Sequence, residues 1–128
     1  MTVSHFPSYQ VIPLCAPDYF KERLFHRGER GESGWTLPPR ALSEERLLLR
    51  EKGSAIRDVF DGAMIQQDLK LSASWVSVNS QTLLHAAEAG LGITFLPDRL
   101  AEEWLEQGRL ITFSLKGISL KNEITWPF

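Results

Sequence analysis

The stretch HAAEAGLGITFLP, residues 85–97, marks the point where a helix gives way to a buried strand. Its alanines suit a helix that packs against a sheet, and Gly90 suits the left-handed residue that ends such a helix. Gly92 has no side chain, so the backbone can pass close to a neighbour there. Ile93, Thr94, Phe95 and Leu96 then begin a strand, and Pro97 closes it because proline cannot donate to a ladder. The stretch predicts a helix–strand junction.

Helical and strand patterns alternate on both sides of this junction. Apolar residues recur at helical spacing over residues 54–68, with Ser54 as the N-cap, and strand patterns lie on either side of that helix. The expected strands cover residues 9–15, 47–50, 71–78, 93–97, 110–113 and 123–126. The other expected helices begin at Pro17, at Asn79 or Ser80, and at Asp98. This alternation predicts an α/β domain with a largely parallel sheet.

The helical spacing also predicts which side chains face the core. The helix that ends at Gly90 is expected to bury Leu91 together with the leucines before it. The helix after Asp98 is expected to bury Leu100 and Trp104. Residues 26–40 are rich in glycine, proline and charge, so we expect a surface loop there with Trp35 as its anchor.

Composition excludes several classes of protein. The chain has 128 residues, of which 43% are hydrophobic and 23% charged, and these values are ordinary for one globular domain. A formal net charge of -2 with scattered Lys and Arg argues against a nucleic-acid-binding face. No apolar run approaches the roughly 18 residues that a membrane span needs, and MTVSHFPSYQ does not resemble a signal peptide. We therefore expect a cytoplasmic protein with no membrane contact and no role for nucleic acid in this region.

The sequence predicts no catalytic site, no cofactor and no metal site. His85 and Glu88 share a helix face and could together hold a metal ion, but a solvated pair fits the same spacing. Nucleophile elbows, phosphate loops and dinucleotide fingerprints are absent. The single Cys15, in VIPLCAP, fits a buried small hydrophobe better than a reactive thiol. The titratable cluster at residues 50–58 fits a charged turn, and we predict that the chain is not an enzyme.

The segment GSAIR, residues 53–57, is the sharpest candidate for a binding site. A glycine turn and a serine at a helix N-terminus offer free N–H groups, a hydroxyl and the positive end of the helix dipole, all of which suit an anion. Arg57 could add a charge-assisted contact. The alternative is that Ser54 only caps its helix and that Arg57 is a solvated surface residue.

Several motifs in order resemble one family. The chain contains LLLREKGSAIRDVFD, then SASWVSVNSQTLLHAAEAGLGITFLP, then a helix that ends EQGRLITF, while VIPLCAPDYF comes first. Each motif is weak alone, but their order and spacing resemble the effector-binding region of LysR-type transcriptional regulators over nearly the whole chain. The resemblance implies a type 2 periplasmic-binding-protein-like α/β fold with a central mixed sheet flanked by helices.

The resemblance also implies where a ligand binds. In this family a small-molecule effector lies in a cleft between two subdomains, and the Ser54 loop matches a position at that cleft, with Gly53 and Arg57 beside it. Ser77, with Trp75 and Asn79, lies near the end of the following strand and is a weaker assignment. We expect Gly53, Ser54, Arg57 and Ser77 to bind a small anionic effector.

The family pattern sets the expected domain organisation. Residues 6–128 would be a partial effector-binding domain, with the second subdomain at 6–97 and the return towards the first subdomain at 98–128. A helix-turn-helix is absent from this sequence, so contact with DNA is expected only through an N-terminal domain outside it.

Two functions from different classes remain open. The first is an inducer-sensing regulatory domain of a LysR-family bacterial transcription factor. The alternative is a solute-binding protein of the same fold that serves a transporter. Exposed strand edges at 110–113 and 123–126 would favour pairing between chains, so we also expect a homo-oligomer.

Overall fold

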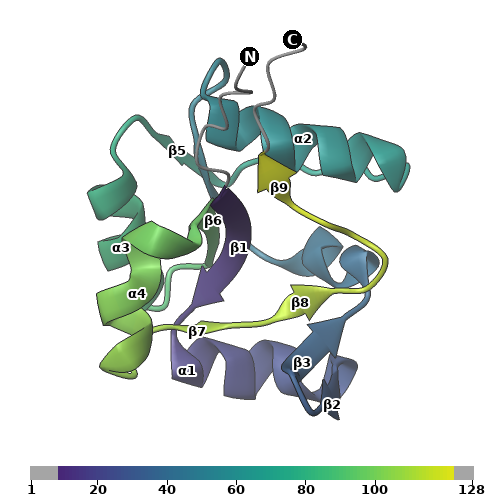
Figure 1. The fold of residues 1–128 in the computed structure, drawn as a ribbon, viewed down its shortest axis with the longest axis vertical. Coiled ribbons are helices and arrows are strands. Elements are labelled where there is room, and N and C mark those ends of the chain that lie inside the picture. Colours follow the sequence, from purple (N-terminus) through teal and green to yellow (C-terminus); the bar gives the residue numbers. More distant parts are fainter. Residues whose placement is uncertain (1–8, 123–128) are drawn as a thin grey trace, which may run out of the picture.

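A computed structural model describes residues 9–122, in which helices cover both faces of a central sheet (Figure 1). The sheet contains, in order, β5 (Trp75–Ser77), β4 (Leu47–Arg50), β6 (Ile93–Pro97), β1 (Tyr9–Cys15) and β7 (Ile111–Thr112), and β9 (Lys121–Asn122) also pairs with β1. Strand β4 is parallel to β5 and to β6. Strand β1 is antiparallel to β6, β7 and β9.

The sheet is therefore mixed, as the family resemblance implies. The alternation of elements predicts a largely parallel sheet. This prediction is wrong for β1, which is antiparallel to each of these partner strands. Alternation along the chain does not encode the direction in which β1 enters the sheet, because the long-range pairing with β6 sets it.

Helices form one layer on each face of this sheet. The helical elements are α1 (Pro17–Tyr19), η1 (Phe20–Leu24), η2 (Phe25–Arg27), η3 (Pro39–Glu44), α2 (Ala55–Gln66), α3 (Ser80–Glu88) and α4 (Asp98–Glu106). Buried residues of α3 and α4 share one core cluster, and buried residues of α2, α1, η1 and η3 share the other. Helix α4 thus packs on the same face as α3, and the expected division at residue 97 stays a prediction.

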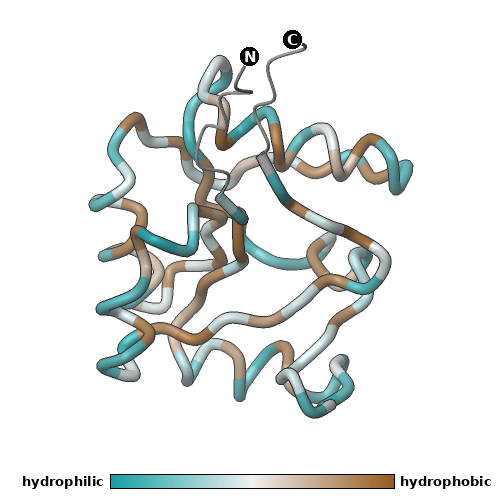
Figure 2. The backbone as a smooth tube through the Cα atoms, viewed as in Figure 1, coloured by the Kyte–Doolittle hydropathy of each residue, from teal (hydrophilic) through white to brown (hydrophobic). Residues whose placement is uncertain are grey.

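The central strands β4 and β6 are mostly apolar because both of their faces are buried, and the hydroxyl of the buried Thr94 donates to the Leu48 carbonyl at 2.7 Å. Along β4, Leu48 joins the cluster with α3 and α4, while Leu49 joins the cluster with α2. Phe95 of β6 packs against Phe60 of α2, with ring centroids 4.6 Å apart. Figure 2 shows hydrophobic residues along these strands and hydrophilic ones at the outer turns. Such strands lose the polar–apolar alternation of a half-exposed sheet.

The two glycines at the end of α3 have the roles that their sequence context predicts. Gly90 has a φ of +82°, so it is the left-handed residue that ends the helix. A Cβ atom on Gly92 would lie 2.4 Å from the carbonyl oxygen of Arg46. The N–H of Ile93 donates to that same carbonyl at 2.8 Å, so the junction is held where it is closest to β4.

The segment expected to be a surface loop contains a hairpin. Strands β2 (Glu29–Gly31) and β3 (Gly34–Leu37) pair antiparallel, and β3 pairs parallel with β8 (Ser114–Leu115). Trp35 anchors the hairpin as predicted, because its ring packs against Phe20 and Phe25 with centroids 5.4 and 5.6 Å apart. The strands are too short to show a periodic pattern, so the sequence indicated only the anchor.

Other expectations are corrected in detail. Leu91 is 46% exposed and Leu100 40% exposed, although the helical spacing predicts that both are buried. Leu91 follows the left-handed turn at Gly90 and so leaves the helix face that its spacing predicted. The strand expected at 71–78 is limited to β5, and the strand expected at 123–126 lies outside the described residues. Within residues 9–122, no helix has the length and apolar character needed to cross a membrane.

Candidate functional site

Two helices begin at the same edge of the sheet. Strands β4 and β5 are parallel, with Arg50 opposite Ser77, so their carboxyl ends meet at this edge. The chain turns from β4 into α2 through residues 51–54, and from β5 into α3 through residues 78–79. We call residues 50–54 and 77–80 the helix-start edge. Edges of this kind, at the carboxyl ends of parallel strands, are where open α/β sheets bind ligands.

Ser54 caps α2 at this edge. Its hydroxyl accepts a hydrogen bond from the N–H of Ile56 at 3.2 Å, and its own N–H donates to the carbonyl of Glu51 at 3.2 Å. A hydroxyl also carries one hydrogen that it can donate. Gly53 has a φ of +99°, and no atom lies within 4 Å of the place where a Cβ would be, so this face of the loop is open.

Asn79 caps α3 on the other side of the edge. Its side-chain oxygen accepts from the N–H groups of Gln81 and Thr82, at 2.8 and 3.2 Å. The Ser77 hydroxyl accepts from the N–H of Asn79 at 3.0 Å and shapes the turn before the helix. The N-termini of α2 and α3 both carry partial positive charge, so the helix-start edge favours an anion.

Arg57 lies one turn into α2, with a side chain that is only 7% exposed. Its Nε–H donates to both carboxylate oxygens of Asp61, at 3.0 and 3.1 Å. Its Nη1 donates to the carbonyl of Arg50 at 2.9 Å. The alternative interpretation, that Arg57 is a solvated surface residue, is therefore wrong. Its hydrogen bonds link α2 to the end of β4.

Arg50 belongs to the helix-start edge, although sequence reasoning placed it in a charged turn. Its Nε donates to Glu51 at 2.9 Å, and its Nη1 donates to the Ser80 hydroxyl at 2.9 Å, so it bridges the starts of α2 and α3. The hydrogen bond from Arg50 lowers the pKa of Glu51. The signal that could have revealed it is a cation as the last residue of the apolar strand LLLR.

The hydrogen-bond partner of the Glu88 carboxylate is Arg109. Arg109 binds the Glu88 carboxylate through two nitrogens, with the Nη2–Oε1 distance at 2.9 Å, and these hydrogen bonds lower the pKa of Glu88. The His85 ring packs edge-on against Trp104, with centroids 4.7 Å apart. Among residues 9–122, no group of three His, Cys, Asp or Glu side chains could hold a metal ion.

Cys15 is the buried small hydrophobe that its sequence context predicts. It is fully buried, and burial, with the charge of Glu45 as a second cause, raises the pKa of its thiol to about 12. The thiolate is the reactive form of cysteine, so this side chain is unreactive near neutral pH.

The comparisons with known proteins show the family. The family model described as "LysR substrate binding domain" matches residues 2–126. A probable hydrogen peroxide-inducible genes activator of Streptomyces viridosporus is 30% identical over 108 residues, which are 83% of this chain and 34% of that protein. The chain thus spans about a third of this curated relative.

Solved structures show the same fold. The Synechocystis PCC6803 CcmR regulatory domain in complex with 2-PG gives a TM-score of 0.73 at 16% identity, over 95% of this chain and 54% of that one. The effector binding domain of QuiR in complex with shikimate gives 0.70 at 10% identity, over 96% and 54%. Regulatory domains of this kind have the type 2 periplasmic-binding-protein-like fold. With its family match over almost its full length, the chain belongs to the LysR substrate-binding domain family.

Proposed function

We propose that this chain is the inducer-sensing region of a LysR-type transcription factor and that it binds a small anionic metabolite at the helix-start edge. The observation that carries the proposal is the meeting of two capped helix N-termini, those of α2 and α3, at one edge of the sheet. Arg50 adds a guanidinium between them. Helix N-termini and guanidinium groups both bind carboxylates and phosphates.

Each predicted site residue has a part in this proposal. Gly53 leaves its face of the loop open, so the backbone can approach a ligand closely. Ser54 donates its hydroxyl hydrogen, and Ser77 holds the turn that starts α3. Arg57 acts by fixing the end of β4 through the Arg50 carbonyl, because its guanidinium is already bound within the fold.

The relatives favour a role in sensing a small molecule over a role in delivering one to a transporter. The curated relative is a genes activator, and CcmR and QuiR are described with small molecules bound to their regulatory domains. In our proposal the metabolite lies between this region and a further subdomain, and closure shifts the balance between two arrangements of the subdomains. DNA contact belongs to an N-terminal domain, this chain carries out no catalytic step, and its place is the cytoplasm.

Replacing Ser54 by aspartate tests the site without removing the helix cap. Aspartate caps helices as well as serine does, so Ser54→Asp should leave the melting temperature of the free chain nearly unchanged. The added carboxylate repels an anion, so we expect a thermal shift seen with small carboxylates or phosphates to disappear. At about 100 times its dissociation constant, a ligand should stabilise the unmodified chain by roughly 2.7 kcal/mol.

The matched control is Ser54→Thr, which keeps both the hydroxyl and the cap. It should retain the thermal shift. If no small anion shifts the melting curve of the unmodified chain, or if Ser54→Asp binds one as well as the unmodified chain does, the helix-start edge is not an anion site.

We also propose that the chain self-associates through β5. Within the described part of the chain, β5 pairs with β4 alone, and Trp75 and Val76 on it are 43% and 49% exposed. An exposed apolar edge strand is a template for pairing with a second chain, and a lysine on the edge blocks it. Val76→Lys should therefore convert a dimer into a monomer in light scattering after size-exclusion chromatography.

Ile65→Lys is the matched control for this substitution. Ile65 lies on α2 and is 74% exposed, so the variant adds the same charge at an apolar surface residue away from β5. It should stay dimeric. A monomeric unmodified chain at high concentration would contradict self-association, and a dimeric Val76→Lys would place the interface elsewhere.

A further inference from the structure

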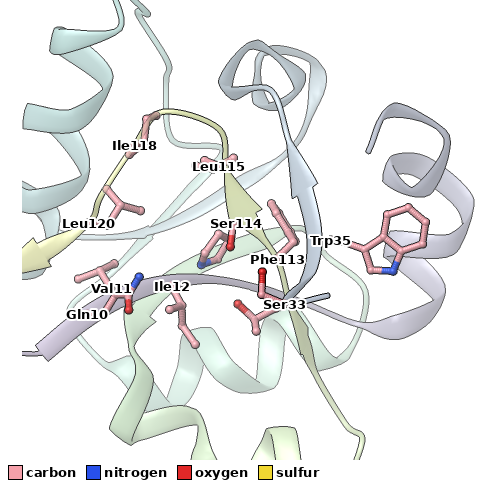
Figure 3. A pocket seen from close by; sticks show the side chains of 12 residues that line it. Gln10, Val11, Ile12, Ser33, Trp35, Phe113, Ser114, Leu115, Ile118 and Leu120 are labelled. Carbon is pink, nitrogen blue, oxygen red and sulfur yellow. The ribbon is translucent and has the colours of Figure 1, made fainter. Parts of the chain in front are cut away.

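In the part of the chain that the structure describes, strand β1 has no partner strand along the middle of one of its edges, and a cavity lies beside this unpaired part. On this edge β1 pairs with β9 at Tyr9 and Gln10, and with β7 at Leu14 and Cys15. Between these pairings Pro13 has no N–H to donate to a neighbouring strand. The hairpin β2–β3 and the segment around β8 border the gap, and a half-open cavity of about 240 Å³ lies there (Figure 3).

The floor of this cavity is apolar and its rim is polar. Val11, Pro13, Phe113, Leu115 and Leu120 line it with buried side chains. The rim carries exposed amide and hydroxyl groups, from Gln10, Ser33, Thr112 and Ser114. None of the described residues that line the cavity carries a charge. Such a lining has hydrogen-bond donors and acceptors for a neutral molecule and no charged group to compensate the charge of an ion.

Size and shape narrow the class of ligand further. An apolar cavity of about 150 Å³ is enough to hold benzene, so the larger cavity here has room for one ring with a polar substituent. Trp35 and Ile118, both half-buried, and the exposed Ser33 complete the lining (Figure 3). A ring would contact the floor while its substituent meets the rim.

We propose that this cavity is a second small-molecule site, which takes an uncharged single-ring compound with one hydroxyl or amide substituent. It is independent of the helix-start edge, since none of the residues that line it belongs to residues 50–54 or 77–80. Its ligand differs in charge from the anion proposed there. The site lies between the central sheet and the β2–β3–β8 sheet, so a bound ring would brace these two sheets against each other.

The test compares benzamide with benzoate, which have nearly the same shape and differ in charge. In an NMR titration of the unmodified chain, benzamide should give saturable shifts at the backbone amides of Trp35, Ser114 and Ile118. Benzoate should bind these positions at least about tenfold more weakly, because the lining offers no counter-charge. Equal binding of benzoate would overturn the assigned ligand class, and no saturable shift at these positions would overturn the site.

Two variants locate the binding. Ser33 is exposed at the mouth, so Ser33→Trp should fill the entrance without disturbing the core and should remove the benzamide shifts. Ser43→Trp adds the same ring at an exposed serine outside the cavity and should keep them. Ser54→Asp should also keep them, which separates this site from the helix-start edge. Benzamide binding that survives Ser33→Trp unchanged would overturn the location.

Discussion

Gly92→Ala should lower the free energy of unfolding by roughly 3 kcal/mol, at the upper end of what an overpacked site usually costs. The new Cβ would lie 2.4 Å from the carbonyl oxygen of Arg46, a contact that no real Cβ makes. Relief requires the backbone to move, but the N–H of Ile93 donates to that same carbonyl at 2.8 Å. The shift would therefore also strain the pairing of β6 with β4.

Gly62→Ala provides the matched control. Gly62 lies inside α2, and an added Cβ would meet no atom within 4 Å. The same substitution should therefore raise stability there by about 0.5–1 kcal/mol, because alanine loses less backbone entropy than glycine in a helix. Urea unfolding of both variants measures the contrast. If Gly92→Ala were as stable as the unmodified chain, close approach could not be the reason for glycine at this junction.

Local chemistry is what made the junction predictable from sequence. A left-handed helix end and a close backbone approach each require glycine, so Gly90 and Gly92 reveal their roles directly. The apolar run of β4 is equally direct, because a strand buried on both faces carries little else. Elements that depend on distant partners were less predictable. The short hairpin β2–β3 gains its place from β8, more than 70 residues further along the chain, and no local pattern signals that.

The residues of the candidate site also fall into two groups. Some are predicted by a local sequence pattern, and others depend on contacts between distant segments. Ser54 before an amphipathic run is a local N-cap signal, and the structure has that cap. The contact between Arg50 and Ser80 joins two loops that meet only because β4 and β5 are parallel neighbours. Sequence reasoning therefore placed Arg50 in a charged turn. It named Arg57 as a candidate ligand-binding residue but could not say that Arg57 is bound within the fold.

Arg57→Met should lower the free energy of unfolding by about 2–3 kcal/mol, since hydrogen bonds made by charged groups contribute roughly this much. Methionine keeps most of the packing of the buried stem but removes the hydrogen bond to the Arg50 carbonyl. Asp61→Asn serves as the control. Asp61 is 38% exposed and can be solvated, so losing its charge should cost less than about 1 kcal/mol.

The two variants also separate the two roles that Arg57 could have. If Arg57 positions the end of β4, Arg57→Met lowers stability, and anion affinity falls only as far as the loop at residues 51–54 loosens. If Arg57 instead contacts the ligand, Arg57→Met would lose anion binding completely under conditions in which it is still fully folded. We expect the first outcome, because the Arg57 guanidinium already binds both Asp61 oxygens and the Arg50 carbonyl. A ligand would have to break these hydrogen bonds to reach it, whereas Ser54 and Gly53 lie on the open side of the same loop.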